Sequence, residues 1–362
     1  MKIKALSLGH LSVPLKKPFR TALRTALEVT TNVVIVETDG GLKGYGEAPP
    51  TAVITGDTSG AIRGAVKERL EPLLVGREAD DLNGLLDTVD SALVGNSSAK
   101  AAVDIALHDL WGKMMNRPLY SLLGGAAKTM ETDYTISVNA PDTMVKDSLE
   151  AVAEGYSALK IKVGTNSDLD IIRLREIRSA VGADVLLRVD ANQGWTAKEA
   201  VRTIRFYEDE GLDIELVEQP VPAYDFQGLK FVTDSVDTLI LADESVFSPR
   251  DAFKVLSMGA ADLVNIKLMK TGGIKNALAI CAMARACGVE CMMGAMMETK
   301  ISVTAAAHLA SAVPVITRAD LDPPILCVSD PVEGGVVYSG PKITLTEGPG
   351  LGISGIRGLV ME

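Results

Sequence analysis

The strongest constraint on the fold of this chain is a regular alternation of short apolar runs with helical patterns, which begins near Thr132 and ends near Asp322. The apolar runs are candidate strands, and they cover residues 132–137, 158–163, 185–190, 214–218, 239–243, 263–268, 290–294 and, more briefly, 318–322. Helical patterns lie between them, for example over residues 169–181, 197–210, 249–256 and 274–287. Seven strand–helix units followed by an eighth strand are what a (β/α)₈-type barrel needs.

A doubly wound open sheet would also alternate, but it rarely has so many units at such even spacing. A dinucleotide-binding sheet would open one of its helices with GxGxxG, and no helix of this chain begins in that way. Gly44-Tyr45-Gly46 lies within a hairpin and is followed by Pro49-Pro50, so we interpret these glycines as structural. The barrel is therefore the better prediction.

The part of the chain before residue 125 follows a different pattern, in which strands precede helices. Residues 4–14 form one expected strand, and residues 33–39 and 42–48 form an expected hairpin about Asp39-Gly40-Gly41. Helical patterns follow near residues 60–74, 80–93 and 99–115. We predict an α+β domain over residues 1–125, a barrel domain over 126–325, and a turn-rich C-terminal segment over 326–362, with a strand near 335–338, that packs back on the first domain.

Charge and composition argue against several classes of protein. The 36 Lys and Arg residues against 47 Asp and Glu residues give a net charge of −11, which does not favour binding to nucleic acid or to a membrane surface. The N-terminus has no apolar core of a signal peptide, and the longest uncharged stretch, 301–317, is Ala-rich and predicts a buried helix and turn. Four cysteines without a CxxC motif indicate a reduced, cytoplasmic protein.

Ionisable side chains end nearly every predicted barrel strand. In a barrel the C-terminal ends of the strands face one pocket, so residues at these ends are the catalytic candidates. A single charge there could be a solvated edge or a helix cap, but burying so many charges without a function would cost several kcal/mol per ion. The candidates, in chain order, are Lys160 and Lys162, Asp190 and Asn192, Glu218, Asp243, Lys267, Glu298, and Asp320 and Asp322.

The residue types at these strand ends indicate metal-assisted proton transfer. Asp190, Glu218 and Asp243 offer only hard oxygen ligands, which suit Mg²⁺, whereas Zn²⁺ would prefer nitrogen or sulfur. Lys162 precedes this triad and Lys267 follows it, so in a closed barrel the two lysines would face each other across the metal. Two bases on opposite faces of one carbon can remove a proton from one side and return it on the other, while the metal stabilises the enediolate.

The histidines do not belong to this site by position. His108 and His308 lie within Ala- and Leu-rich helical runs, so we expect them to be packed or surface residues, and His10 lies in the N-terminal region.

Several motifs together resemble the enolase superfamily, in its muconate-lactonising subgroup, from Lys2 to about Gly358. They are KIKVG (160–164), DANQGW (190–195), VEQP (217–220), ADES (242–245), NIKLMKTGG (265–273) and the hairpin end GYGEAPP. Catalysis by a Lys or His base together with Mg²⁺ is general to this superfamily. The resemblance implies a modified TIM barrel, (β/α)₇β, with an N-terminal α+β capping domain whose loops at about 15–30 and 50–60 set substrate specificity.

Within this subgroup the chain is most similar to the dipeptide epimerases, in particular those acting on L-Ala-D/L-Glu. PFRTALRTA (18–26), METK (297–300) and Asp320-x-Asp322 carry this narrower resemblance. It implies a cytoplasmic isomerase with one Mg²⁺ per subunit, a small dipeptide substrate, a homo-oligomeric state and a place in murein (cell-wall) peptide metabolism. Ala295 and Met297 depart from the Ser and branched residue usual in these epimerases, which bears on the second side chain of the substrate.

The resemblance also implies a role for each matched residue. Lys162 and Lys267 would be the two bases, and Asp190, Glu218 and Asp243 the Mg²⁺ ligands. Lys160 would bind the substrate α-carboxylate, and Arg24 the side-chain carboxylate of the second residue. The ammonium of the dipeptide would be held by Asp320 and Asp322, while the remaining site residues would be Thr135, Met297 and Glu298. Ala-Glu carries one ammonium and two carboxylates, and these groups supply one complement for each.

Three alternatives remain open at this point. The first is another enzyme of the subgroup: an o-succinylbenzoate synthase, an N-acylamino acid racemase or a muconate cycloisomerase, whose substrates lack the ammonium that Asp320 and Asp322 would bind. The second is a Schiff-base aldolase with Lys162 or Lys267 as nucleophile, which would survive EDTA and be trapped by borohydride. The third is a peptide- or metal-binding protein without activity, which the complete set of acids, bases and ligands disfavours.

Overall fold

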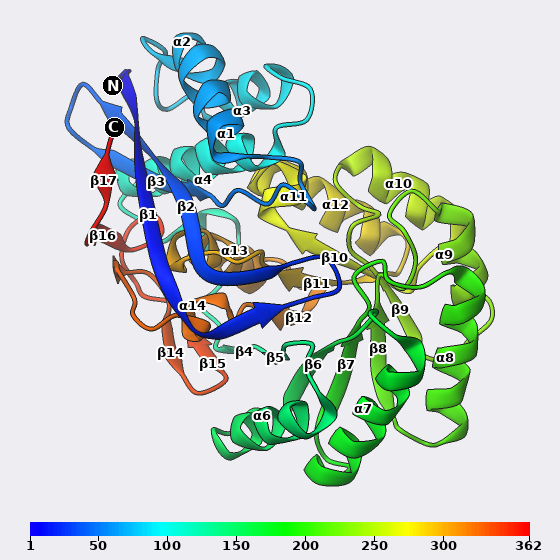
Figure 1. Ribbon diagram of the computed structural model, residues 1–362. Coiled ribbons are helices and arrows are strands. Elements are labelled where there is room, and N and C mark those ends of the chain that lie inside the picture. The colour runs from blue at the N-terminus through cyan, green and yellow to red at the C-terminus, as the bar shows by residue number, and fades with distance from the viewer.

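The centre of the molecule is a sheet of eight parallel strands whose spatial order follows the sequence. A computed structural model describes residues 1–362, and in it each strand pairs with the next one along the chain, as in a barrel wall (Figure 1). The strands are β5 (Tyr134–Ile136), β6 (Ala158–Lys162), β7 (Leu186–Asp190), β8 (Ile214–Glu218), β9 (Leu239–Ala242), β10 (Leu263–Lys267), β11 (Glu290–Gly294) and β12 (Ile316–Asp320). The prediction of a modified barrel is confirmed.

Helices connect these strands and cover the outside of the sheet (Figure 1). The connecting helices are α6 (Pro141–Ala153), α7 (Ser167–Val181), α8 (Ala197–Asp209), α9 (Phe226–Thr233), α10 (Pro249–Met258), α12 (Ile274–Ala286) and α13 (Lys300–Ala312), with the short α11 (Leu268–Thr271) and α14 (Pro323–Leu326). Inside the sheet a cluster of Leu216, Leu241, Leu263 and Met292 forms a small core of its own. Three of these residues lie two positions before Glu218, Asp243 and Gly294, so the apolar layer supports the strand ends from below.

A second sheet, with the order β17-β1-β2-β3, forms the cap. Its strands are β1 (Ile3–Arg20), β2 (Thr25–Thr38), β3 (Lys43–Ala48) and β17 (Val360–Met361), so the last strand returns to the first. Helices α1 (Ser59–Gly64), α2 (Glu71–Leu74), α3 (Leu82–Ser91), α4 (Ser97–Met114) and α5 (Leu119–Leu122) follow, with a π-helical segment, η1 (Ala65–Leu70), inside the first predicted helix. Gly46 is structural as expected, because a Cβ there would lie 1.9 Å from the Ala102 carbonyl oxygen of α4.

The hairpin of β1 and β2 is longer than the sequence pattern indicates. The expected strand ends at Pro14, whereas β1 continues to Arg20 through a break in register between Pro14 and Phe19. The tip reaches the barrel (Figure 1), where the Arg20 carbonyl accepts a hydrogen bond of 3.1 Å from the Val138 amide just after β5. This docking on the barrel orders a segment whose prolines and lysines interrupt the alternation of apolar residues.

The C-terminal segment consists of short strands that join several parts of the molecule. They are β13 (Val332–Gly334), β14 (Val337–Ser339), β15 (Lys342–Thr344) and β16 (Ile353–Ile356), and β15 also pairs with β4 (Met130–Glu131). The strand expected at 335–338 therefore lies slightly later in the chain. All four cysteines are free, and only Cys287 is exposed.

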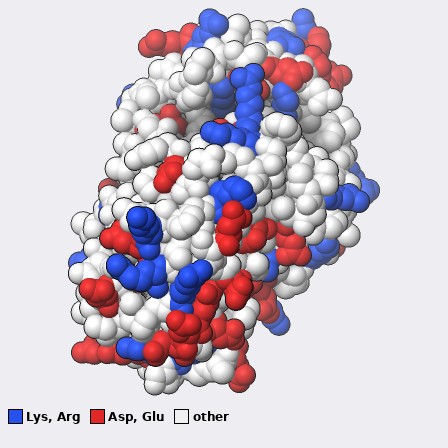
Figure 2. All heavy atoms as spheres, turned by 90° about the vertical axis from the view of Figure 1, so that its right-hand side faces the viewer, with Lys and Arg blue, Asp and Glu red and all other residues white.

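Two further features of the molecule are the distribution of its surface charge and the character of its helices. Positive and negative side chains are interspersed on the face shown in Figure 2, so this face has no continuous basic stripe. None of the helices combines the length and the apolar character that a passage through a membrane demands.

Candidate active site

The ends of the barrel strands carry a dense network of buried ion pairs. Lys160 and Lys162 lie on one face of β6, as the two-residue period of a strand predicts, and their neighbours on β7 and β8 are in register with them. The Lys160 Nζ atom lies 2.6 Å from Glu218 Oε2, 2.7 Å from Asp320 Oδ2 and 3.1 Å from Asp190 Oδ2. Lys162 Nζ lies 2.5 Å from Asp190 Oδ2.

A second half of this network lies on β10. Lys267 Nζ is 2.7 Å from Asp243 Oδ2 and 3.6 Å from Glu218 Oε1. Lys270, which the sequence pattern did not single out, pairs with Asp243 Oδ1 at 2.6 Å. Asn265, also missed, donates from Nδ2 to Glu218 Oε1 at 2.8 Å, and its position two residues before Lys267 could have revealed it.

The lysines favour the ionised form of the nearby carboxylates and outweigh burial at Asp190 and Asp243, whereas burial and the charge of Asp190 raise the pKa of Glu218. Although burial opposes it, the ammonium groups of Lys162 and Lys160 lower the pKa of Asp190 to about 2. Burial also acts against ionisation of Lys267, but Asp243 and Glu218 raise the pKa of its ammonium above the ordinary value. Buried charges of both signs thus stabilise one another, which is the condition for keeping them at this depth.

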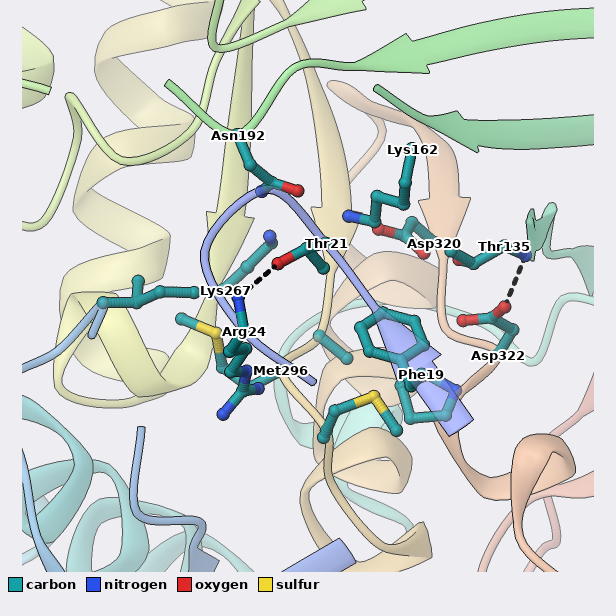
Figure 3. A pocket seen from close by; sticks show the side chains of 14 residues that line it. Phe19, Thr21, Arg24, Thr135, Lys162, Asn192, Lys267, Met296, Asp320 and Asp322 are labelled. Atoms are coloured by element: carbon teal, nitrogen blue, oxygen red, sulfur yellow. Dashed lines mark hydrogen bonds between the residues drawn. The ribbon is translucent and has the colours of Figure 1, made fainter. Parts of the chain in front are cut away.

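A pocket of about 490 Å³, including the open solvent at its mouth, lies over the two lysines that were predicted to be bases. Lys162 and Lys267 reach it from β6 and β10, two strands that three others separate in the sheet (Figure 3). Its wall joins strand ends of the barrel to the cap, through Phe19, Thr21, Arg24, Ile54, Thr135, Asn192, Ala295, Met296, Met297, Asp320, Asp322 and Pro323.

Two ionisable residues of the pocket wall have no partner of opposite charge within the protein. Arg24, at the tip of the β1–β2 hairpin, makes no ion pair, and burial lowers the pKa of its guanidinium. Asp322 accepts a hydrogen bond of 2.7 Å from the Thr135 amide but has no cationic partner. Burial and the neighbouring Asp320 raise the pKa of Asp322 to about 7. Figure 3 shows Arg24 beside Lys267 on one side of the pocket and Asp322 on the other side, below Lys162.

Asp190, Glu218 and Asp243 fit a hard divalent cation by their chemistry. All three are buried oxygen donors at the ends of adjacent strands β7, β8 and β9. Glu218 Oε2 and Asp243 Oδ1 accept no hydrogen bond, although the ammonium groups of Lys160 and Lys270 lie near them. Buried carboxylate oxygens that no amide or hydroxyl group satisfies are suitable ligands for Mg²⁺. The ammonium groups of the neighbouring lysines balance the charge of these carboxylates.

Two residues expected to contact substrate lie outside the pocket wall. Lys160 is 1% exposed and sits beneath the floor, where its ammonium is occupied by three carboxylates. Glu298 turns away from the pocket and accepts a hydrogen bond of 2.7 Å from the Met296 amide. Thr135, Met297, Asp320, Asp322 and Arg24 do line the pocket.

Several pocket residues received no individual role from the sequence. Asn192 was among the strand-end candidates, because it follows Asp190 on the same face and belongs to the motif DANQGW, and it does line the pocket. Phe19, Thr21 and Ile54 lie in the two loops, at about 15–30 and 50–60, that the resemblance implied for specificity, but which of the loop residues reach the pocket depends on how the cap docks on the barrel. The histidines lie elsewhere, as expected: His108 and His308 are buried in helices, and burial lowers the pKa of His308 to about 4.

Comparison with known proteins gives consistent matches over the whole chain. Residues 5–124 match the N-terminal domain of the mandelate racemase / muconate lactonizing enzymes, and residues 143–355 match the enolase C-terminal domain-like family. The L-Ala-D/L-Glu epimerase of Clostridium acetobutylicum is 56% identical over 357 residues, which cover 99% of this chain and 100% of the relative.

Solved structures of dipeptide epimerases are also similar to this chain over nearly its whole length. A substrate-liganded complex of the L-Ala-D/L-Glu epimerase from Bacillus subtilis has a TM-score of 0.97 and 52% identity, covering 99% of this chain and 100% of that chain. A dipeptide epimerase from Enterococcus faecalis, complexed with Mg and the dipeptide L-Leu-L-Tyr, has a TM-score of 0.94 and 43% identity, covering 98% of this chain and 100% of that chain.

Proposed function

The chain belongs to the mandelate racemase / muconate lactonizing enzyme family of the enolase superfamily, and on this basis we propose that its preferred substrate is L-Ala-D/L-Glu. The protein is a dipeptide epimerase, an isomerase that uses Mg²⁺. We propose in addition that the second residue of the substrate is acidic and that individual side chains have the roles given below.

One observation supports this proposal above all: Arg24 and Asp322, a basic and an acidic side chain, line one pocket and neither has a counter-ion in the protein. A charged group that is partly or fully removed from water and has no counter-ion is unfavourable. A ligand that brings a carboxylate to Arg24 and an ammonium to Asp322 therefore binds more tightly than one that brings neither. The ammonium of an Ala-Glu dipeptide complements Asp322 together with Asp320, and the side-chain carboxylate complements Arg24. Substrates of the alternative subgroup enzymes have no ammonium for Asp322.

The lysine pair performs the proton transfer in this scheme. Lys162 and Lys267 approach the pocket from opposite strands, so the α-carbon of the second residue would lie between them. The lysine in its neutral form takes the α-proton from one face, and the other, as an ammonium, returns a proton to the opposite face. Asp190, Glu218 and Asp243 would hold Mg²⁺, whose charge stabilises the negative charge that develops on the substrate carboxylate. Lys160 would support the α-carboxylate side from beneath the floor.

The test is a screen of dipeptides in D₂O with Mg²⁺, read by mass and by chiral separation. We expect L-Ala-L-Glu and L-Ala-D-Glu to reach the same mixture with deuterium at the α-carbon of Glu, faster than L-Ala-L-Leu or N-succinyl-glutamate. Faster turnover of N-succinyl-glutamate would favour an N-acylamino acid racemase. A borohydride-trapped adduct that forms equally well in EDTA would favour the aldolase.

We also propose the organisation and setting of the enzyme that its sequence implied. The chain would divide near residues 125 and 325 into cap, barrel and C-terminal segment, and it would form a homo-oligomer in the cytoplasm, where L-Ala-D-Glu arises from murein peptides. The four free cysteines support a reducing compartment. Light scattering during size-exclusion chromatography measures the oligomeric state. A measured mass equal to that of one chain would contradict the proposed homo-oligomer.

A further inference from the structure

A buried glutamate of the cap, Glu47, is bound to the barrel by hydrogen bonds from the start of helix α13. Glu47 lies at the end of β3 and is fully buried. Its carboxylate accepts hydrogen bonds from the Ser302 amide at 2.8 Å, the Ser302 hydroxyl at 2.9 Å, the Thr299 hydroxyl at 2.9 Å and the Thr299 amide at 3.3 Å. The first amides of a helix have no partner within the helix, so a carboxylate from the cap satisfies them and favours the helix dipole.

A second buried glutamate, Glu298, meets the same serine. The Ser302 hydroxyl contacts Glu298 Oε2 as well as Glu47 Oε1, but a hydroxyl has only one hydrogen to donate. Neither glutamate makes an ion pair with a lysine or arginine. The set of contacts is satisfied when one of the two carboxyl groups carries a proton and donates it to the serine oxygen.

The contacts place that proton on Glu298. Glu47 receives hydrogen bonds from two amides and two hydroxyls, all of which favour the ionised form, whereas Glu298 receives only the Met296 amide and the shared serine. Burial and the charge of Glu47 raise the pKa of Glu298 to about 7, while Lys267 on β10 acts in the opposite direction. Burial also raises the pKa of Glu47, and the thiol of Cys327 is the further titratable group that faces it.

Both ends of this chain of contacts lead to the pocket wall. Glu298 holds the amide of Met296, which lines the pocket together with Ala295 and Met297. On the side of the cap, Glu47 immediately precedes the segment that carries Ile54 into the same pocket. The contacts therefore tie one wall from the barrel to one wall from the cap.

We propose that Glu47, Ser302 and a protonated Glu298 form a proton-sharing link that positions the Ala295–Met297 wall against the cap and thereby shapes the subsite for the second side chain of the dipeptide. Glu298 is then a positioning residue and does not contact substrate. This inference rests on the proposed function for its substrate, but the link itself is a property of the fold.

The test compares Glu298→Gln, Glu47→Gln and Ser302→Ala. The matched control is Glu37→Gln, since Glu37 is a half-buried glutamate of the same sheet that pairs with Lys4 and makes no contact with α13. A glutamine at 298 imitates the protonated acid, so Glu298→Gln should keep the KM for L-Ala-L-Glu close to that of the wild type. Glu47→Gln places an amide NH₂, itself a donor, against the donor groups of Thr299 and Ser302, and Ser302→Ala removes the hydroxyl that the two glutamates share. Both of these variants should raise the KM about tenfold. Their kcat should change little, because the lysine pair is unaltered.

Hydrogen–deuterium exchange of the holoenzyme supplies a readout that does not depend on activity. In Glu47→Gln and Ser302→Ala, peptides covering 49–58 and 294–300 should both exchange faster, whereas Glu298→Gln and Glu37→Gln should match the wild type. An equal rise in KM and in exchange rate for Glu298→Gln and Glu47→Gln would show that Glu298 is not protonated and would overturn the proposal.

Unchanged KM and unchanged exchange in Ser302→Ala would also overturn the proposal, even if Glu47→Gln failed to fold. If the wild type failed to epimerise any dipeptide, the proposed function would fall while the exchange data still decided the link.

Discussion

At the scale of single residues, the pocket is defined by charges that the protein leaves uncompensated. Most buried charges near the strand ends are paired within 2.5–2.7 Å, such as Lys162 with Asp190 and Lys267 with Asp243. Arg24 and Asp322 are different, since each lines the pocket without a partner of opposite charge. In the proposed function, the paired groups maintain the site and the unpaired groups select the substrate.

Replacement of Arg24 by Ala should reduce recognition of acidic dipeptides. The loss of a charge-assisted hydrogen bond of about 1.5–3 kcal/mol predicts a fall of roughly one to two decades in kcat/KM for L-Ala-L-Glu, with much smaller changes for L-Ala-L-Leu. Arg20→Ala is the matched control, because Arg20 lies on the same hairpin but is exposed and contacts Asn139. Equal losses on acidic and apolar dipeptides would mean that Arg24 only supports the hairpin.

The two lysines should separate exchange from inversion. Without Lys162, the remaining lysine can still remove the α-proton of one epimer and return deuterium to the same face, and without Lys267 the other epimer should behave in this way. Loss of a positioned acid or base typically lowers the rate by ~10²–10⁴-fold, so the residual exchange in D₂O remains measurable by NMR. A single Lys→Ala variant that still epimerises at nearly the wild-type rate would refute the two-base scheme.

At the scale of elements, helix α4 of the cap is joined to helix α12 of the barrel by one carboxylate. Asp104 on α4 accepts a hydrogen bond of 2.7 Å from the Ile274 amide at the start of α12, and His108 Nδ1 lies 3.1 Å from its Oδ1 atom. Burial acts against the charged imidazole, but Asp104 raises the pKa of His108 above its ordinary value. The contribution of a raised histidine pKa is complete below pH about 6.5 and is lost as the pH rises through the folded-state pKa.

Asp104→Asn should therefore destabilise the fold in a pH-dependent way. Asparagine keeps an oxygen for the Ile274 amide but loses the charge, so we expect the free energy of unfolding to fall by about 1.5 kcal/mol at pH 6 and by less at pH 9. Urea unfolding at both pH values measures the difference. Asp81→Asn, which alters the cap of α3 without a histidine nearby, should show no such trend. An equal cost at both pH values would mean that His108 is neutral in the folded protein.

At the scale of the whole molecule, the strand ends of the barrel and the cap come together above a set of carboxylates. The lysines balance Asp190, Glu218 and Asp243, and two carboxylate oxygens remain without hydrogen bonds. A ligand that binds the folded state alone stabilises it according to its concentration relative to Kd. Bound Mg²⁺ should consequently be visible in both activity and thermal stability.

Removal of Mg²⁺ should abolish epimerisation and lower the melting temperature. EDTA followed by excess Mg²⁺ should restore both, with a stabilisation of about 2.7 kcal/mol at a metal concentration of 100 times Kd. Glu218→Gln should stay folded but lose most turnover and most of the Mg²⁺-dependent rise in melting temperature. Full activity in excess EDTA, with no metal detected by elemental analysis, would contradict the role of all three carboxylates.

The barrel and the alignment of its strand ends could be predicted from the order of the residues alone. The reason is local: side chains alternate along a strand, and successive parallel strands end at the same edge, so Lys162, Asp190, Glu218 and Lys267 could be brought together without coordinates. The fold class predicted on that basis is confirmed.

The way in which the cap completes the pocket emerged only from the three-dimensional arrangement of the chain. The β1–β2 hairpin extends to Arg20 and brings Phe19 to the site, Lys160 lies beneath the floor, and Glu298 turns toward Glu47. Each of these features depends on contacts between residues far apart in the chain. Such contacts depend on how the surfaces of cap and barrel fit together and on which buried groups need hydrogen-bond partners. Neither requirement produces a periodic pattern of residues that could be recognised in the sequence.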